Sequence, residues 1–376
     1  MKEGWEYKKL GEVCRIERGG SPRPIKDFIT NSPEGLNWIK IGDTDPQGKY
    51  IYSTKEKIKP EGLRKSRWVE VDEFLLSNSM SFGRPYILKT NGCIHDGWLV
   101  LRDYQNSLII DYFYYLLISP HVQNQFRTKA QGSTVSNLNT DRVADVNIAF
   151  PPLSEQQSFV DYLDSAFAKI DAMKANAEKA LNEAKALFQA SLKEMLEPKE
   201  GWESMKLGDF AYMKAGDFVK ASDIYQNYAE GLYPCYGGNG FRGYVNEPNQ
   251  EGDYCLIGRQ GALCGCVNRA KGIFRTTEHA VIVKPYQDIP TSLVYYMLIN
   301  LNLNKYATGA AQPGLSVKNI SEQVIIPVPP RKAHSTIAET LDSLKSKVDR
   351  LKANYEKISK ECDALKQALL KEVFEG

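Results

Sequence analysis

The sequence predicts a mixed α/β (α+β) protein in which two globular domains are separated by two long helices that pair as an antiparallel coiled coil. Three observations predict this fold: a length suited to at least two cores, segments that occur twice, and long heptad patterns. The arrangement is an internal repeat with a pseudo-twofold relation between its halves. The expected segments are a domain at residues 1–152, a helix at 153–197, a second domain at 198–330 and a second helix at 331–376.

Length and composition indicate compact, globular domains. The chain has 376 residues, of which 42% are hydrophobic, and this is more than one ordinary domain core takes up. The first residues lack the apolar stretch of a signal peptide, and no window approaches the roughly eighteen apolar residues of a membrane span. We therefore expect a cytoplasmic protein with no membrane partner.

Two segments of the sequence occur twice. The pattern Gly-Trp-Glu followed by Lys-Leu-Gly at residues 4–11 returns at residues 201–208, a shift of 197. Residues 159–195 return as residues 337–373, a shift of 178, with 18 of 37 positions identical. Chance would give only a few identities, so we interpret these segments as copies.

The middles of the two halves share little sequence. They cover roughly residues 12–130 and 209–308, and they agree only in faint cues such as a Tyr-Tyr pair at 114–115 and 295–296. If both middles bind something, we expect them to bind different things. Their short β-branched and aromatic runs predict mixed domains with many strands. Strands are expected at residues 36–41, 69–71, 98–101, 252–257 and 280–283, and helices at 109–127 and 291–306.

The copied segments 159–195 and 337–373 have the pattern of coiled-coil helices. Apolar residues recur at alternating spacings of four and three, which is the a/d pattern that faces a partner helix. Packing alone allows a parallel pairing. The chain order of domain, helix, domain, helix favours an antiparallel pairing, with residue 159 opposite residue 369. The predicted seam includes Phe159, Leu163, Ile170, Met173 and Leu187 in the first helix, and Ile337, Leu341, Val348, Leu351, Ile358 and Leu365 in the second.

The two helices are expected to begin differently. In the first, Ser154 can cap the helix and Gln157 can complete a capping box. The second follows a proline-rich run at residues 327–330 and has no such box.

Familiar catalytic and metal-binding patterns are missing from the sequence. The seven cysteines are irregularly spaced, and no zinc-binding set accompanies them. Residues 238–243 match the G-x-G-x-x-G pattern, but flanking prolines and the lack of a following helix argue against a dinucleotide site. The four histidines have no nucleophile at a suggestive spacing. We therefore expect no catalytic residue, metal or cofactor on this chain.

Two local runs of positive charge indicate contact with nucleic-acid phosphates. The formal net charge is only +2, which is a weak pointer by itself. Residues 18–67, however, carry eleven Lys and Arg against six Asp and Glu, and residues 259–275 carry four against none. Both runs are rich in Gly, Tyr, Trp and Asn, a mixture suited to loops that meet phosphates and base edges.

Several motifs resemble those of the specificity subunits of type I restriction-modification systems. The run Tyr-Pro-Cys-Tyr-Gly-Gly-Asn-Gly at residues 233–240 resembles a recurrent turn of that family, as do the runs at 257–265 and 276–280. In the first half, Trp-Ile-Lys-Ile-Gly-Asp at residues 38–43 and Pro-Pro-Leu-Ser-Glu-Gln-Gln at 151–157 are similar to two further family elements. The resemblance covers essentially the whole chain.

The resemblance implies a non-catalytic DNA specificity subunit that serves host defence. Two target recognition domains would each read one half of a bipartite double-stranded DNA site, and the helices would fix the spacer between the half-sites. Two methyltransferase subunits would dock around the helices and bring S-adenosylmethionine for DNA methylation. Restriction subunits would bring ATP and magnesium.

The sequence departs from the family pattern at two places. Arg331, Lys332, Ala333 and His334 stand where the family has Leu-x-Glu-Gln after a Pro-Pro pair, so the second helix is expected to start in another way. The first domain also lacks the glycine-rich turn of residues 237–240. This difference is expected if the two domains read different half-sites.

Residues that contact DNA are expected in the loops of both middles. In the major groove, Arg reads guanine and Asn or Gln reads adenine. The alternative is a coiled-coil scaffold without sequence-specific DNA binding, and salt-dependent binding to a bipartite duplex would separate the two functions. The candidates are Arg23, Lys26, Asn78, Ser81 and Arg84 in the first domain, and Asn239, Arg242, Arg259, Gln260, Arg275 and His279 in the second.

Overall fold

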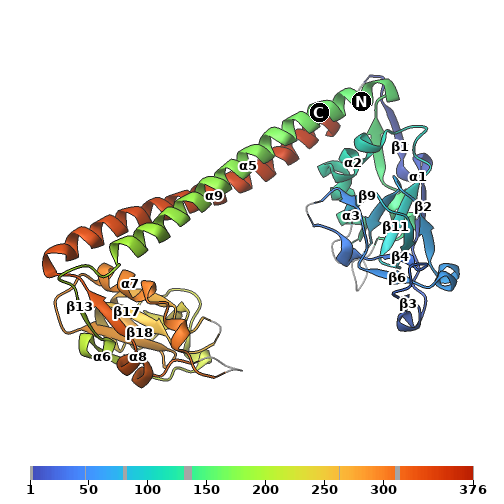
Figure 1. Cartoon of the computed structure of the whole chain (residues 1–376). Helices are drawn as coiled ribbons and strands as arrows, with labels where there is room; N and C mark the ends of the chain where they lie inside the picture. Colours follow the sequence, from blue (N-terminus) through green and yellow to red (C-terminus); the bar gives the residue numbers. More distant parts are fainter. Residues whose placement is uncertain are drawn as a thin grey trace. The chain divides into compact units, whose positions relative to one another are not determined.

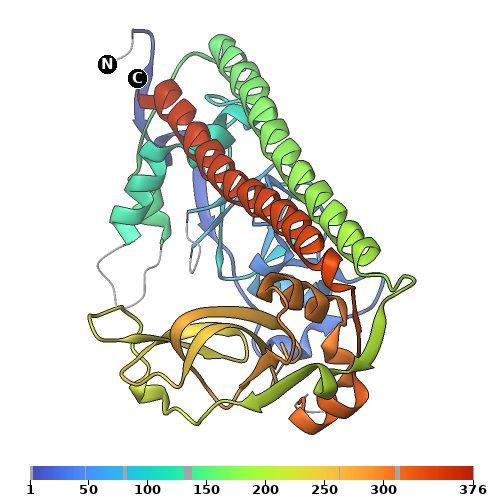
Figure 2. The same ribbon diagram turned by 90° about the vertical axis from the view of Figure 1, so that its left-hand side faces the viewer.

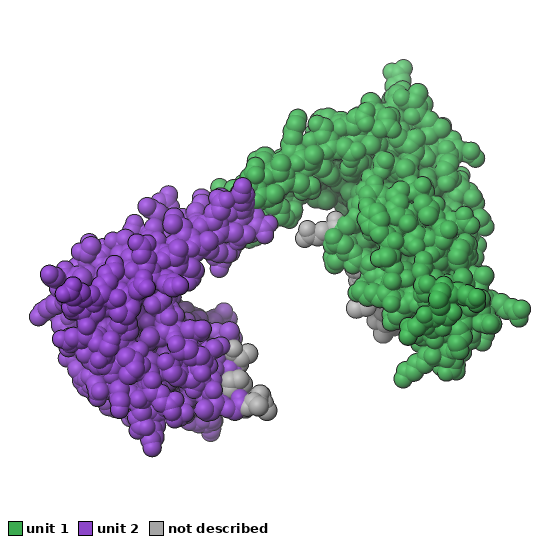
Figure 3. Space-filling model, viewed as in Figure 1, with its two compact units in different colours: residues 1–176, 357–376 green, residues 177–356 purple. Residues whose placement is uncertain are grey.

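The chain divides into two compact units. Unit 1 comprises residues 1–176 and 357–376, and unit 2 comprises residues 177–356 (Figure 3). The structure is a computed structural model, and it describes residues 3–46, 48–78, 83–130, 138–261, 263–309 and 314–375. Each unit contains one end of each long helix.

The main sheet of unit 1 has five strands. All its neighbours are antiparallel except the last pair, in which β5 runs parallel to β9. In order across the sheet the strands are β2 (Arg15–Arg18), β11 (Trp98–Arg102), β8 (Phe74–Ser77), β9 (Pro85–Leu88) and β5 (Tyr50–Ile51).

A second five-stranded sheet packs against one face of the main sheet of unit 1. Alternate residues of each main-sheet strand point to opposite faces. Leu75 and Val100 therefore join a core with Ile39 and Ile94 of the second sheet. In order the strands of the second sheet are β3 (Ile29–Thr30), β6 (Glu56–Ile58), β4 (Leu36–Ile39), β10 (Gly92–Ile94) and β7 (Arg67–Val69).

Helices cover the other face of the main sheet of unit 1. Phe74, Leu76, Leu99 and Leu101 point to that face and belong to the largest core of the unit. The helices of this layer are α2 (Ile110–Ile118) and α3 (Pro120–Ala130), both labelled in Figure 1, and the short α4 (Thr140–Ala144).

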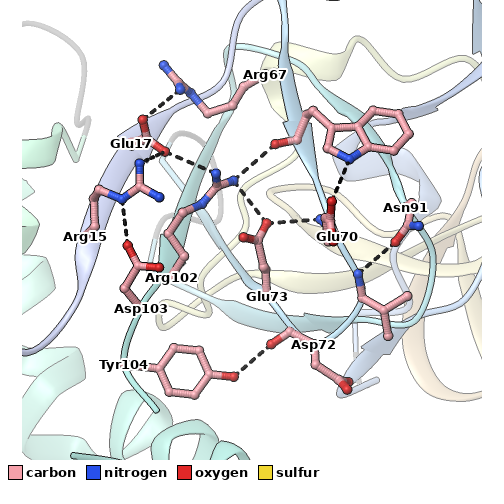
Figure 4. Close-up of polar contacts among 12 residues, drawn as sticks. Arg15, Glu17, Arg67, Glu70, Asp72, Glu73, Asn91, Arg102, Asp103 and Tyr104 are labelled. Atoms are coloured by element: carbon pink, nitrogen blue, oxygen red, sulfur yellow. Dashed lines mark hydrogen bonds and ion pairs between the residues drawn. The ribbon is translucent and has the colours of Figure 1, made fainter. Parts of the chain in front are cut away.

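A network of ion pairs joins the two sheets of unit 1 (Figure 4). Arg102 of β11 lies 3.3 Å from Glu17 and 3.0 Å from Glu73, and it donates to the carbonyl oxygen of Trp68 on β7. Arg67 of β7 contacts the same Glu17 at 2.8 Å. Burial raises the pKa of Glu73, although Arg102 opposes this shift. Arg102 is thus the central cation of a partly buried cluster, with its side chain 16% exposed.

Replacing Arg102 by methionine is expected to destabilise unit 1 by about 3 kcal/mol, because Glu73 then loses the cation that compensates its burial and Glu17 keeps Arg67 but loses Arg102. Urea unfolding followed by tryptophan fluorescence measures this loss, since four of the five tryptophans lie in unit 1. The matched control is Arg15→Met, which breaks a pair with Asp103 whose side chains are 55% and 62% exposed, and a longer contact of 3.5 Å with Glu17, which keeps Arg67 and Arg102. That change should cost less than about 1 kcal/mol, and equal losses would contradict a special role for Arg102.

The main sheet of unit 2 repeats the topology of the main sheet of unit 1. Its first five strands have the same order and the same directions, including a parallel last pair of β18 and β15, and one strand is added at the edge. The unlike middles therefore share a common sheet, which their sequences do not reveal. In order the strands are β14 (Ala211–Ala215), β19 (Ala280–Pro285), β17 (Gln250–Gly258), β18 (Val267–Thr276), β15 (Tyr233–Gly237) and β16 (Gly240–Val245).

A small frame next to the long helices also occurs in both units. In unit 1, β1 (Glu6–Lys9) pairs with β12 (Asn147–Phe150), and α1 (Leu10–Val13) follows β1. In unit 2, β13 (Glu203–Lys206) pairs with β20 (Ile325–Val328), and α6 (Leu207–Phe210) follows β13. Unit 2 also contains α7 (Thr291–Asn300) and α8 (Val317–Gln323).

The Tyr-Tyr pairs of the two middles hold each unit to a long helix. The Tyr115 hydroxyl donates to Asp164, and the Tyr296 hydroxyl donates to Asp342 at 2.7 Å. Asp164 and Asp342 are repeat-related positions of the copied segments. The Tyr-Tyr pair, one of the few similarities between the two middles, thus makes an equivalent contact in both units.

The two long helices run antiparallel where they pair within each unit. They are α5 (Leu153–Met195) and α9 (His334–Glu375), and Figures 1 and 2 show them side by side. In unit 1, Val160 and Leu163 share a core with Phe374, and in unit 2, Phe188 shares one with Leu341. The predicted antiparallel coiled coil is confirmed.

The predicted capping box at the start of α5 is wrong, and another glutamine anchors the helix. The helix begins at Leu153, so Ser154 lies inside its first turn. Gln156 is fully buried, accepts a hydrogen bond from the Ile109 amide and donates to the carbonyl oxygen of Pro151.

In the second half, a histidine replaces that glutamine. His334 is the repeat equivalent of Gln156, and its Nε2 lies 2.8 Å from the carbonyl oxygen of Pro329, the equivalent of Pro151. The 3-10 turn Arg331–Ala333 precedes α9. Although residues 331–334 depart from the family motif, His334 thus keeps the contact that Gln156 makes at the start of α5.

The predicted seam residues of α5 differ in burial, and two of them do not fit the seam. Leu163 and Ile170 are buried and Phe159 is partly buried, but Met173 and Leu187 are 58% and 59% exposed. Their neighbours in the next row, Leu181 and Phe188, are buried instead. The apolar face of the helix is wider than one partner helix covers, so the sequence pattern did not distinguish the two rows.

The predicted seam residues of α9 are buried or partly buried at all positions but one. Ile337, Leu341 and Val348 are buried and Leu351 and Ile358 are partly buried, but Leu365 is 47% exposed. Lys366 takes its place, with its ammonium group over the Phe167 ring and 2.6 Å from Asp171. Cys362 rather than Ile358 meets the backbone of Ile170, so the register differs from the predicted one by about a turn.

The predicted strands lie within or next to observed ones, but both predicted helices of the middles are interrupted. The helix expected at residues 109–127 breaks between Ile118 and Pro120, and the one expected at 291–306 continues only as a 3-10 turn at Leu303–Tyr306. All seven cysteines are free. No helix among the described residues has the length and apolar character needed to cross a membrane.

Candidate nucleic-acid interface

Most of the predicted DNA-contacting residues that the structure describes lie where the strands of each main sheet end on one side, and we call this side the recognition edge. In unit 1 this edge consists of the loop after β2, the end of β8 and the loop before β11. In unit 2 it consists of the loop after β14, the loop after β17 and the loop before β19. Strands β2, β8 and β11 of unit 1 thus occupy the same places in their sheet as β14, β17 and β19 in unit 2.

A glycine marks the same point of both recognition edges. Gly19 follows β2 and Gly216 follows β14, and a Cβ atom there would lie 2.2 Å from the carbonyl oxygen of His95 or of Thr276, respectively. Their amides donate to the carbonyl oxygens of Trp98 and Ala280, respectively. Only glycine allows the two loops to approach so closely.

A hollow of about 400 Å³ opens at the recognition edge of unit 2 and is lined by four predicted residues. Asn239 and Arg242 come from the β15–β16 hairpin, Gln260 follows β17, and His279 precedes β19. Asn239, Arg242 and Gln260 are exposed, and the structure gives Arg242 no carboxylate partner among the described residues. The hollow thus combines a cation with two amides, the groups that read guanine and adenine in the major groove.

Close packing fixes the hairpin that forms one wall of the hollow. A Cβ atom at Gly258 would lie 2.0 Å from the carbonyl oxygen of Gly238, so β17 can approach the hairpin tip only with glycine there. The Cys266 thiol donates to the same oxygen at 2.8 Å. His279 completes the wall, with its Nε2 3.0 Å from Glu278.

The other two predicted arginines of unit 2 are half-buried near this edge. The Nε atoms of both Arg259 and Arg275 are buried and have no hydrogen-bond partner among the residues that the structure describes. Arg275 donates through Nη1 to the carbonyl oxygen of Glu247 and lines a separate hollow of about 380 Å³ with Lys220. Neither arginine lines the hollow that holds Arg242.

In unit 1, a polar cluster forms around Asp96, just before β11. Arg23 and Ser21 contact its carboxylate at 3.2 and 2.8 Å, and Arg18 and Asn78 donate to its carbonyl oxygen. The Ser21 hydroxyl lowers the pKa of Asp96, and burial lowers the pKa of the adjacent His95. The sequence pointed to Arg23 and Asn78 but missed Arg18, Ser21 and Asp96, which become visible only when β2 and β11 pair.

The predicted residues of unit 1 differ in their access to solvent. The side chain of Arg23 is 79% exposed and Lys26 is exposed, whereas Asn78 is 1% exposed and holds the loops together. Arg84 is half-buried with its guanidinium 5.4 Å from the centre of the Tyr86 ring. Ser81 lies outside the described residues.

The cysteines near the recognition edge of unit 2 lie in surroundings that disfavour the thiolate. Burial raises the pKa of the Cys235, Cys264 and Cys266 thiols, so they stay protonated near neutral pH. Among the described residues, no group of three His, Cys, Asp or Glu side chains is placed to hold a metal ion.

One family model matches this chain twice, once in each half of the repeat. The model of the type I restriction modification DNA specificity domain matches residues 2–183 and again residues 199–360. The specificity subunit of the Escherichia coli type I restriction enzyme EcoprrI is 29% identical over 352 residues, which cover 90% of this chain and 86% of that one. The EcoKI specificity subunit of Escherichia coli K12 is 22% identical, over 100% of this chain and 89% of that one.

Solved structures share the fold. A chain from a study of assembly and conformational transition of the type I R-M system aligns with a TM-score of 0.79 at 19% identity, over 99% of this chain and 97% of that one. The HsdS subunit from Thermoanaerobacter tengcongensis aligns with a TM-score of 0.57 at 21% identity, over 100% of this chain and 98% of that one.

Proposed function

This chain belongs to the type I restriction modification DNA specificity family, and from that premise we propose that its two recognition edges each read one half of a bipartite DNA site. The chain is the specificity component of its complex and leaves catalysis to partner subunits. We propose that it acts in the cytoplasm, where its DNA target lies. The observation that carries the proposal is the repeated recognition edge, which bears predicted DNA-contacting residues in both units.

The different surroundings of the two edges support two different half-sites. The edge of unit 2 has the hollow formed by the β15–β16 hairpin, whereas that of unit 1 has the cluster around Asp96. The domain limits that we propose are residues 1–152 and 198–330 for the recognition domains, and residues 153–197 and 331–376 for the helices between them.

We propose that two methyltransferase subunits bind the long helices and that restriction subunits complete the complex. Leu187 and Leu365 support two equivalent docking surfaces. They are repeat-related positions, one in each unit, and both are exposed although they are large and apolar. Exposed leucines at equivalent positions fit a partner that binds the same face twice.

The experiment that tests the function is a map of methylated bases in cells that express the chain with its partner subunits. We expect a bipartite motif with one constant spacer. A variant lacking one heptad from both α5 and α9 should keep the half-sites and change the spacer, because these helices connect the recognition domains along the chain.

Two outcomes would contradict this proposal. A spacer that the heptad deletion leaves unchanged would contradict the role of the helices. If the purified complex showed no salt-dependent preference for the mapped duplex, the chain would be a scaffold rather than a specificity subunit.

A further inference from the structure

Phe241 is an exposed, large apolar side chain that lines the hollow of unit 2 beside polar side chains. It lies on the β15–β16 hairpin between Asn239 and Arg242, and it is 53% exposed. Neighbouring groups that line the hollow, such as Gln260 and His279, can form hydrogen bonds to base edges. Phe241 cannot, so its contribution to binding must be apolar.

The Phe241 ring is held in place by other aromatic rings. It packs edge-on against Tyr236 at 6.0 Å and against Tyr244 at 5.2 Å between ring centres. Tyr236 in turn packs against Phe274, which is fully buried, and Tyr244 against Tyr228. Such edge-to-face contacts connect Phe241 to the core beneath the sheet. The ring is therefore fixed in the hollow before any ligand arrives.

We propose that Phe241 packs on the 5-methyl group of a thymine in the half-site read by unit 2. This inference rests on the proposed function. The thymine methyl is the one apolar group that base pairs present in the major groove, and phenylalanine is among the side chains that contact it. Asn239, Arg242 and Gln260 would read the base pairs beside it. Phe241 is then a specificity-determining residue of this edge.

The test replaces thymine by uracil, which removes only the methyl group, at one position of the half-site at a time. Binding of the assembled complex is measured for the natural chain, Phe241→Ala and Phe241→Leu. At one position, uracil should weaken binding of the natural chain about fourfold, the effect expected for losing one buried methyl group. The same uracil should have no effect on Phe241→Ala, while Phe241→Leu should keep part of the effect.

Tyr286→Ala is the matched control, because Tyr286 is a 65% exposed aromatic residue beyond the other end of β19. It should show the same uracil effect as the natural chain. The inference is overturned if no uracil position depends on Phe241, or if Phe241→Ala weakens all duplexes equally. Specific binding of the unmodified duplex, measured in the same series, tests the proposed function separately.

Discussion

Arg242→Ala is expected to lower the affinity of the assembled complex for its target by about 5-fold to 150-fold, corresponding to about 1 to 3 kcal/mol. Discrimination between bases should be lost at one base pair only. Arg242 is exposed in the hollow of unit 2, and its guanidinium can donate to both acceptors of a single guanine. Substituting each base pair of the half-site in turn, for both proteins, measures this. The variant should no longer discriminate at one position.

Arg269→Ala is a suitable control for this change. Arg269 is also an exposed arginine of unit 2, but it is paired with Asp253 on the neighbouring strand at 3.0 Å. Its loss should leave base discrimination intact. If Arg242→Ala instead weakened binding to every sequence by the same factor, Arg242 would be a phosphate contact and not a base reader.

Leu187→Asp and Leu365→Asp should each remove one methyltransferase subunit from the complex, and the double variant should remove both. Burying a leucine in an interface contributes about 1.5 to 3 kcal/mol, and an unpaired carboxylate in its place adds a desolvation cost. Both residues are exposed on their helices, so the fold of the chain itself should be unaffected. The mass of the purified complex measures the number of bound subunits.

The repeat supplies a matched control pair for these variants. Asn182→Asp and Lys360→Asp introduce the same carboxylate at exposed, repeat-related positions five residues earlier, on another face of each helix. Those variants should assemble fully. Full assembly of the double leucine variant as well would show that the methyltransferase subunits bind elsewhere.

The long helices and the repeat could be predicted from sequence because their signals are local and periodic. Leu163, Ile170 and Leu341 follow a spacing that any helix pair would need. The row containing Met173 and Leu187 was assigned wrongly because an apolar row beside the seam has the same period as the seam. Periodicity shows that a face is apolar, but it does not show what covers the face.

The shared sheet of the two units could not be predicted because it depends on long-range pairing. Strands β2 and β11 are separated by 79 residues in sequence, yet they bring Arg18 and Ser21 to Asp96. The glycine-rich turn in unit 2 was a better guide. Asn239 and Arg242 stand on one hairpin, so their neighbourhood is already visible in the sequence.

The composition of unit 1 has a consequence for synthesis of the chain. Its core includes Leu370, Val373 and Phe374, which pack with Val160 and Leu163. About 180 residues of unit 2 are translated between these two groups, which takes about 10 to 40 seconds on a ribosome. During that time the apolar face of the first half of α5 lacks the end of α9 that covers it. Unit 1 is therefore the first unit to begin emerging and the last to be completed, and a prematurely terminated chain leaves this face exposed to chaperones and proteases.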